Sequence, residues 1–135
     1  MKAPDIFQVE DDENFTFFME NAVSEMDESL VLKIAPNGLE AMQFLRELQY
    51  NSVKPGMILL DINLPGISGF DILKAVREIE FFHSVPVVIF STSDNPRDAE
   101  KMMKFGANGY QTKPMGYLGL LSCLDSMRKD YLRIN

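Results

Sequence analysis

The chain has 135 residues, of which 46% are hydrophobic and 24% charged, so it can build the packed core of one ordinary domain and is too apolar for disorder. The net charge of −7 and the scattered Lys and Arg residues exclude a typical nucleic-acid-binding surface, which needs clustered positive charge. Because no apolar run could span a bilayer or serve as a secretory signal, we expect a cytoplasmic protein without membrane contact.

Short apolar runs alternate with amphipathic segments along the whole chain, which is the pattern of strands alternating with helices. In chain order, the expected strands cover residues 6–9, 30–35, 57–60, 85–90 and 108–111. The helices expected between and after them have apolar faces that begin at Phe15, Ala41, Ile72, Ala99 and Tyr117. The first of these faces also includes Phe18. Asn37 is predicted to cap the second helix, with Glu40 completing a capping box.

Strict alternation of five strands and five helices implies right-handed crossovers and a parallel sheet covered by helices on both faces. The third and fourth strands are continuously apolar, as expected of strands that are buried on both faces. Gln8 interrupts the first strand with an amide, which needs either a buried partner or an exposed face. With no linker or repeat, the sequence predicts one α/β domain over residues 1–135 and no effector domain.

Polar side chains follow four of the five strands, where open α/β sheets bind their ligands. In chain order they are Glu10, Asp11 and Asp12, then Asp61, then Ser91 and Thr92, and finally Lys113. Each group alone has an ordinary interpretation as a helix cap, a turn residue or a solvated charge. Their convergence favours a site, because crowded carboxylates attract a cation and a site of few oxygen ligands suits Mg²⁺. Lys113 and Ser91 would then offer a positive charge and a hydrogen-bond donor to a phosphoryl group.

Four segments at this edge resemble the signature segments of the response-regulator receiver domain. They are residues 9–12, residues 59–66 with Gly69, residues 86–91 and residues 106–114. The similarity spans nearly the whole chain, in order and with the expected spacing. It implies a flavodoxin-like, doubly wound sheet of order 2-1-3-4-5. It also implies a phosphorylation switch of a two-component system or phosphorelay, with at most self-phosphorylation and autodephosphorylation chemistry.

The resemblance also implies a role for each matching residue. Asp61 would accept a phosphoryl group from the phosphohistidine of a sensor histidine kinase or a histidine phosphotransfer protein. Asp11 and Asp61 would bind Mg²⁺ directly, Glu10 would bind it through water, and the backbone carbonyl of Asn63 would complete the protein ligands.

The remaining roles concern the switch. Ser91 would be the hydroxyl that moves towards the phosphoryl group, Tyr110 the rotating aromatic side chain and Lys113 the ion-pair partner. A cis peptide bond is expected before Pro114. The output would pass to an unknown downstream protein, and the chain is expected to be a monomer or a weak homodimer.

Two other classes of function use a similar set of residues. A Mg²⁺-dependent phosphohydrolase could use Asp61 as its nucleophile, but the chain has no spare segment to form a substrate pocket or cap. A flavin- or nucleotide-binding module would need a Gly-rich or Ser/Thr-rich loop where residues 10–13 are acidic. We further expect His83 to be structural or solvated and not the phosphodonor, and Cys123 to be a buried, inert thiol.

Overall fold

The apolar runs of the sequence form a parallel sheet in the computed structural model, which describes residues 1–132. Its strands are β1 (Ile6–Val9), β2 (Leu32–Ala35), β3 (Met57–Leu60), β4 (Val87–Ser91) and β5 (Gly109–Thr112). Their order in the sheet is β2-β1-β3-β4-β5, as the resemblance to receiver domains implies. The fourth strand ends later than expected, so Ser91 is its last residue instead of the first residue of the following turn.

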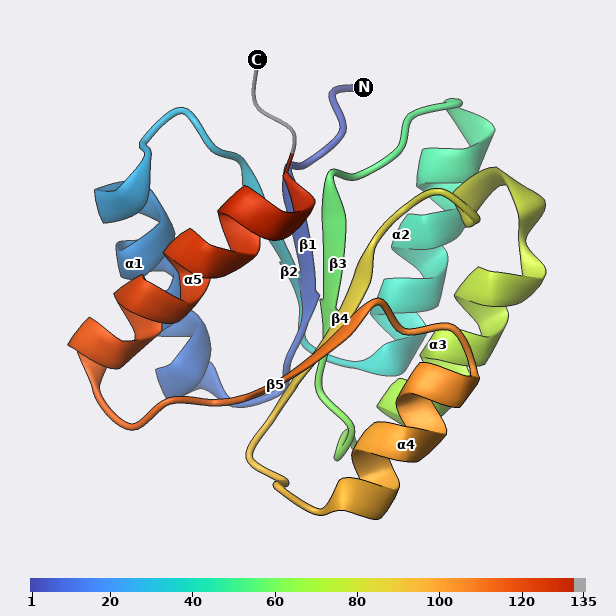
Figure 1. The fold of residues 1–135 in the computed structure, drawn as a ribbon. Coiled ribbons are helices and arrows are strands. Elements are labelled where there is room, and N and C mark those ends of the chain that lie inside the picture. Colours follow the sequence, from blue (N-terminus) through green and yellow to red (C-terminus); the bar gives the residue numbers. More distant parts are fainter. Residues whose placement is uncertain (133–135) are drawn as a thin grey trace.

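Helices cover both faces of the sheet (Figure 1). They are α1 (Glu13–Met26), α2 (Gly38–Tyr50), α3 (Gly69–Glu78), α4 (Pro96–Lys104) and α5 (Tyr117–Tyr131). In Figure 1, α1 and α5 lie on one face, while α2, α3 and α4 lie on the other. None of the helices within residues 1–132 has the length and apolar character needed to cross a membrane.

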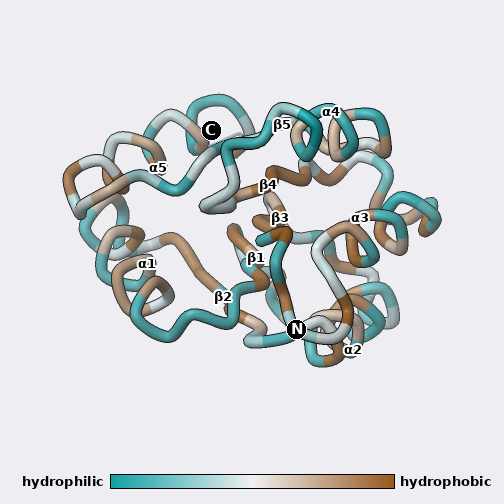
Figure 2. The backbone as a smooth tube through the Cα atoms, turned by 90° about the horizontal axis from the view of Figure 1, so that it is seen from below, coloured by the Kyte–Doolittle hydropathy of each residue, from teal (hydrophilic) through white to brown (hydrophobic). Residues whose placement is uncertain are grey.

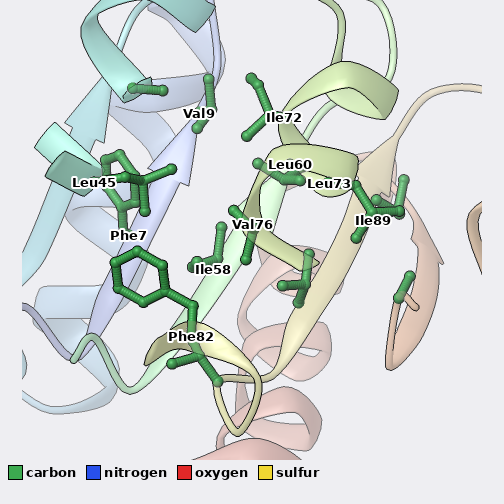
Figure 3. Packing of buried hydrophobic residues seen from close by; sticks show 14 of the residues in the cluster. Phe7, Val9, Leu45, Ile58, Leu60, Ile72, Leu73, Val76, Phe82 and Ile89 are labelled. Carbon is green, nitrogen blue, oxygen red and sulfur yellow. The ribbon is translucent and has the colours of Figure 1, made fainter. Parts of the chain in front are cut away.

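Side chains that alternate along the strands fill two separate hydrophobic cores. Phe7 and Ile58 belong to the core under α2 and α3, where Figure 3 shows Phe7 near Leu45 and Ile58 near Val76. Ile6 and Leu59 belong to the opposite core, under α1 and α5. Seen from below in Figure 2, the apolar strands occupy the middle of the molecule, and many helix segments at its periphery are polar.

Side chains at the helix starts fix where several helices begin. The Asp12 carboxylate caps α1 by accepting hydrogen bonds from the backbone N–H groups of Asn14 and Phe15. Asn37 caps α2 as predicted, since its side chain accepts from the Glu40 backbone N–H at 2.9 Å. The Glu40 carboxylate accepts from the Asn37 side-chain amide at 3.0 Å, which is a variant of the expected capping box.

Two sequence expectations about burial are wrong. Phe18 is 48% exposed, because α1 meets the sheet through Met19, Ala22 and Val23, and Phe18 lies outside that face. Gln8 is only 1% exposed, and neither of its amide atoms has a hydrogen-bond partner within residues 1–132. Among the described residues, Gln8 therefore has neither the exposed face nor the buried partner that the sequence leads us to expect.

His83 and Cys123 have structural surroundings. A ring nitrogen of His83 lies 2.9 Å from the Arg77 carbonyl oxygen, and the neighbouring Phe82 is buried in the core. Cys123 is half-buried, and burial raises the pKa of its thiol to about 11. His83 is exposed, which fits the expected structural or solvated role, whereas Cys123 is less buried than expected.

Candidate functional site

The order of the strands brings acidic residues from β1 and β3 side by side. Val9 pairs with Leu60 at the carboxyl ends of these neighbouring strands, and Glu10 and Asp61 follow directly. The Glu10 backbone N–H donates to the Ala35 carbonyl, and the Asp61 N–H donates to the Val9 carbonyl. Both acidic residues are buried. The sheet itself therefore fixes where their side chains begin.

Glu10, Asp11 and Asp61 form an acidic cluster in which one carboxylate oxygen from each residue lies within 4.8 Å of the other two. Asp11 is exposed, so the cluster opens to solvent on one side. Like charges at this spacing repel one another, and a bound cation relieves the repulsion. Because the donors are all hard oxygens and few in number, the cluster can hold a divalent cation that keeps several waters.

Lys113 places a positive charge against this cluster. Its Nζ lies 2.5 Å from Glu10 Oε1 and 3.2 Å from Asp61 Oδ2. Burial acts to lower the pKa of Lys113, but the hydrogen bonds and negative charges of Glu10 and Asp61 outweigh it and raise the pKa. Burial also raises the pKa of Glu10, and the nearby ammonium offsets this only in part. The lysine therefore remains a cation at neutral pH.

The loop after β3 holds Asp61 from its other side. The Asn63 backbone N–H donates to Asp61 Oδ1 at 3.3 Å, and Asn63 itself is exposed. Gly69 packs directly against this loop, and a Cβ atom at position 69 would lie only 1.9 Å from the Asp61 carbonyl oxygen. A glycine is needed here because any side chain would push the Asp61 backbone out of place.

Ser91 and Tyr110 both make hydrogen bonds to Ser93, which the sequence did not single out. The buried Ser91 Oγ accepts from the Ser93 backbone N–H at 3.3 Å. The Tyr110 hydroxyl donates to the Ser93 carbonyl at 2.8 Å. The Ser93 hydroxyl in turn donates to Asp98 Oδ2 in the first turn of α4 at 2.6 Å. Only its place in the polar turn after β4 could have drawn attention to Ser93.

The predicted site residues thus divide into three groups. Glu10, Asp11, Asp61 and Lys113 meet in one cluster, as expected from the sheet. Asn63, Ser91 and Tyr110 lie on the adjoining loop and strands, while Asp12 caps α1 and Thr92 is exposed.

The expectation of a cis bond before Pro114 is wrong, because no cis peptide bond occurs within residues 1–132. The Lys113 backbone N–H donates to the Ser91 carbonyl at 2.7 Å, which keeps it beside β4. The chain then turns towards α5 at Gly116, whose φ of 93° is favourable for a glycine.

The fold and this cluster agree with comparisons to known proteins. The sequence matches the model of the response regulator receiver domain over residues 6–125, so the chain belongs to this family. It is 32% identical to the response regulator Rcp1 of Synechocystis, over 81% of this chain and 74% of Rcp1. It is 34% identical to the two-component response regulator ARR17 of Arabidopsis thaliana, over 60% of this chain and 58% of ARR17.

Solved structures that resemble this chain are also response regulators. The phosphorylated cyanobacterial phytochrome response regulator RcpA has a TM-score of 0.85 and 27% identity, covering 96% of this chain and 94% of RcpA. The Mn²⁺-bound form of Rcp1 has a TM-score of 0.77 and 27% identity, covering 98% of this chain and 97% of Rcp1. The chain is thus a receiver domain of two-component signalling, a family whose members generally act as signalling switches. This assignment favours the switch over the phosphohydrolase and the flavin-binding module.

Proposed function

We propose that Asp61 accepts a phosphoryl group in a two-component system or phosphorelay, and that Mg²⁺ at the acidic cluster is required for the transfer. The observation that carries the proposal is the place of the Asp61 carboxylate. It is part of a cluster that can hold a divalent cation, and its Oδ2 lies 3.2 Å from the ammonium of Lys113. A bound cation and the Lys113 ammonium would both lie close enough to offset the negative charge of an incoming phosphoryl group.

The transfer itself exchanges one bond to phosphorus for another. A carboxylate oxygen of Asp61 forms a bond to phosphorus while the bond to the donor imidazole nitrogen breaks, and the electron pair leaves with the ring. Lys113 supplies positive charge beside the incoming oxygens, and the Ser91 hydroxyl donates a hydrogen bond to one of them. Bound Mg²⁺ would neutralise further negative charge on the phosphoryl group.

The chain offers a small set of ligands for that ion. We assign it to the carboxylates of Asp11 and Asp61, to the backbone carbonyl of Asn63 and, through water, to Glu10. Their oxygen-only chemistry supports Mg²⁺, which binds few protein carboxylates and retains water. The three carboxylates of this set already lie within 4.8 Å of one another.

We propose that the output begins at Ser91. Movement of its hydroxyl towards the phosphoryl group would release the Ser93 N–H and alter the surface of α4, β5 and α5, which another protein reads. Tyr110 is already half-buried against the core and bonded to the Ser93 carbonyl. The signal would therefore reach Tyr110 through Ser93, whose hydrogen bonds to Ser91 and Tyr110 exist before phosphorylation.

A small acyl phosphate and Mg²⁺ distinguish this function from that of a phosphohydrolase. The switch accumulates one labile phosphoryl group per chain, measured by intact mass, whereas a phosphohydrolase releases phosphate over many turnovers. The natural donor is tested with purified histidine kinases and phosphotransfer proteins. A phytochrome-type kinase belongs among them because RcpA is a phytochrome response regulator.

Partner, oligomeric state and location remain predictions. Pull-down with and without phosphorylation identifies the downstream protein, and light scattering on a sizing column separates a monomer from a weak homodimer. Cell fractionation tests the expected cytoplasmic location.

A further inference from the structure

The Lys113 ammonium has a third neighbour besides the two carboxylates. Its Nζ lies 4.4 Å from the centre of the Phe15 ring, on α1. The Lys113 side chain is only 8% exposed, so little of it meets water. An aromatic face attracts a cation through the negative charge of its π system, most strongly where water is excluded. The ring therefore takes the place of solvent on one side of the ammonium.

Contacts from two directions hold Phe15 in this position. Its backbone N–H donates to Asp12 Oδ1 at 3.3 Å, and the Asp12 N–H donates to Glu10 Oε2 at 3.1 Å. Its ring meets that of Phe90 nearly edge-on, with the centres 5.4 Å apart. Because Phe90 directly precedes Ser91, the ring is placed jointly by the acidic residues and by β4.

We propose that Phe15 is a positioning residue for Lys113, and that its aromatic face holds the ammonium between Glu10 and Asp61. A lysine head group on a flexible stem has many alternative positions, and each would remove positive charge from Asp61. The inference rests on the proposed phosphoacceptor function of Asp61. It adds that α1 contributes an aromatic group to the site, beside the residues that resemble the family's signature segments.

A simple packing role for Phe15 is the competing explanation. The ring also lines an apolar hollow of about 230 Å³ together with Phe18, Pro114, Tyr117 and Leu120. A side chain that only fills space responds to changes in size. A ring that holds a cation depends instead on the electron density of its face. Fluorine substituents withdraw this electron density with little change in the volume of the ring.

The test incorporates phenylalanine with one, two or three ring fluorines at position 15 and measures the rate of phosphorylation by a small acyl phosphate. We expect the logarithm of the rate to fall with each added fluorine. Phe15→Leu should slow the reaction by about two- to fivefold, in keeping with a cation–π contact of ordinary strength. Phe15→Tyr keeps the aromatic face and should react nearly as fast as the wild type. The control is Phe17→Leu on the same helix, at a residue that is 62% exposed, which should leave the rate unchanged.

A second readout does not depend on phosphorylation. In the unphosphorylated protein, the ring current of Phe15 should shift the NMR signals of the Lys113 methylene next to Nζ, and Phe15→Leu should abolish this shift while Phe17→Leu keeps it. A wild type that takes no phosphoryl group but shows the Phe15-dependent shift overturns the role of Asp61 and supports the contact. Loss of the rate dependence on fluorine, or absence of the shift, overturns the role of Phe15.

Discussion

At the carboxyl end of the sheet, three carboxylates share a small space with one buried ammonium. Lys113 offsets the charges of Glu10 and Asp61, because its Nζ contacts both, but the exposed Asp11 receives no such contact from it. The balance of charge at these few residues therefore determines how strongly a cation binds. It also determines how much repulsion the fold carries without one.

Asp11→Asn should weaken cation binding and, at the same time, stabilise the fold without a cation. The substitution removes one of the proposed charged ligands, so the affinity for Mg²⁺ should fall at least about tenfold. It also removes one of the crowded like charges, so the thermal midpoint without Mg²⁺ should rise. Calorimetric titration measures the first effect and scanning calorimetry the second. Unchanged affinity would remove Asp11 from the ligand set, and a lower midpoint would show that the crowding costs nothing.

Gln8→Met should stabilise the protein. Gln8 is buried in β1, and its two amide atoms lack hydrogen-bond partners within residues 1–132, a situation that costs about 1–3 kcal/mol for a buried polar group. Methionine has a similar length and no amide to desolvate, so urea denaturation should show a higher free energy of unfolding. A clear decrease would mean that the amide is satisfied by a buried water that the substitution displaces.

At the scale of secondary structure elements, the loop after β3 and the start of α3 pack against the backbone of Asp61. Helix α3 begins at Gly69, after a capping box between Ser68 and Asp71. The Gly69 N–H donates to the Ile62 carbonyl at 3.2 Å, which brings the helix start against the Asp61 backbone. Asp61 thus depends on a close backbone contact as well as on the strand that carries it.

Gly69→Ala should disturb this contact. An added Cβ would lie 1.9 Å from the Asp61 carbonyl oxygen, and overpacking of this kind costs about 1–3 kcal/mol. We expect a lower free energy of unfolding in urea and slower phosphorylation by a small acyl phosphate. The matched control is Glu78→Ala at the exposed end of the same helix, which should change neither. Equal stability of the wild type and Gly69→Ala would show that the loop moves away freely.

Much of the element order could be predicted because each signal is local. Residues 85–90 are nearly all apolar and β-branched, and Asn37 precedes a periodic helix, so both elements follow from short stretches of sequence. The order of the strands came from the resemblance, since periodicity gives no strand neighbours. The acidic cluster followed from the rule that ligands bind at the carboxyl ends of parallel strands.

The unpredicted features involve contacts between distant parts of the chain. The spacing of apolar residues along α1 does not predict that Phe18 lies outside the buried face. It also does not predict that the Phe15 ring contacts Lys113. The Arg77 guanidinium is another case, because it donates to the carbonyl oxygens of Gly106, Phe82 and Val85 and so ties α3 to the segments before β4 and β5. From the sequence alone, Arg77 cannot be distinguished from an arginine that is exposed on the surface.

At the scale of the whole molecule, the site lies at the carboxyl ends of the neighbouring strands β1 and β3, inside the sheet. β4 and β5 connect it to the α4–α5 side, since Lys113 N–H donates to the Ser91 carbonyl and Ser93 links Ser91 to Tyr110 and α4. A phosphoryl group on Asp61 would add roughly −1.5 to −2 charge units and three strong acceptors beside these elements. A local change in charge can thereby alter a distant surface.

The output surface is tested by backbone NMR with and without phosphorylation. Signals around Met102, Tyr110 and Tyr117 should shift in the wild type. They should shift much less in Ser91→Ala and Lys113→Ala, which we expect to accept a phosphoryl group to some extent without transmitting its effect. Shifts confined to the surroundings of Phe15 on α1 would place the output on a different face.

The phosphoacceptor role of Asp61 is tested most directly by intact mass. The wild type and Asp61→Ala are each incubated with a small acyl phosphate, with and without Mg²⁺. We expect a labile gain of one phosphoryl group in the wild type with Mg²⁺, and none without the ion or in Asp61→Ala. A phosphoryl group that persists in Asp61→Ala would contradict this expectation and move the acceptor elsewhere, with Asp12 the next candidate.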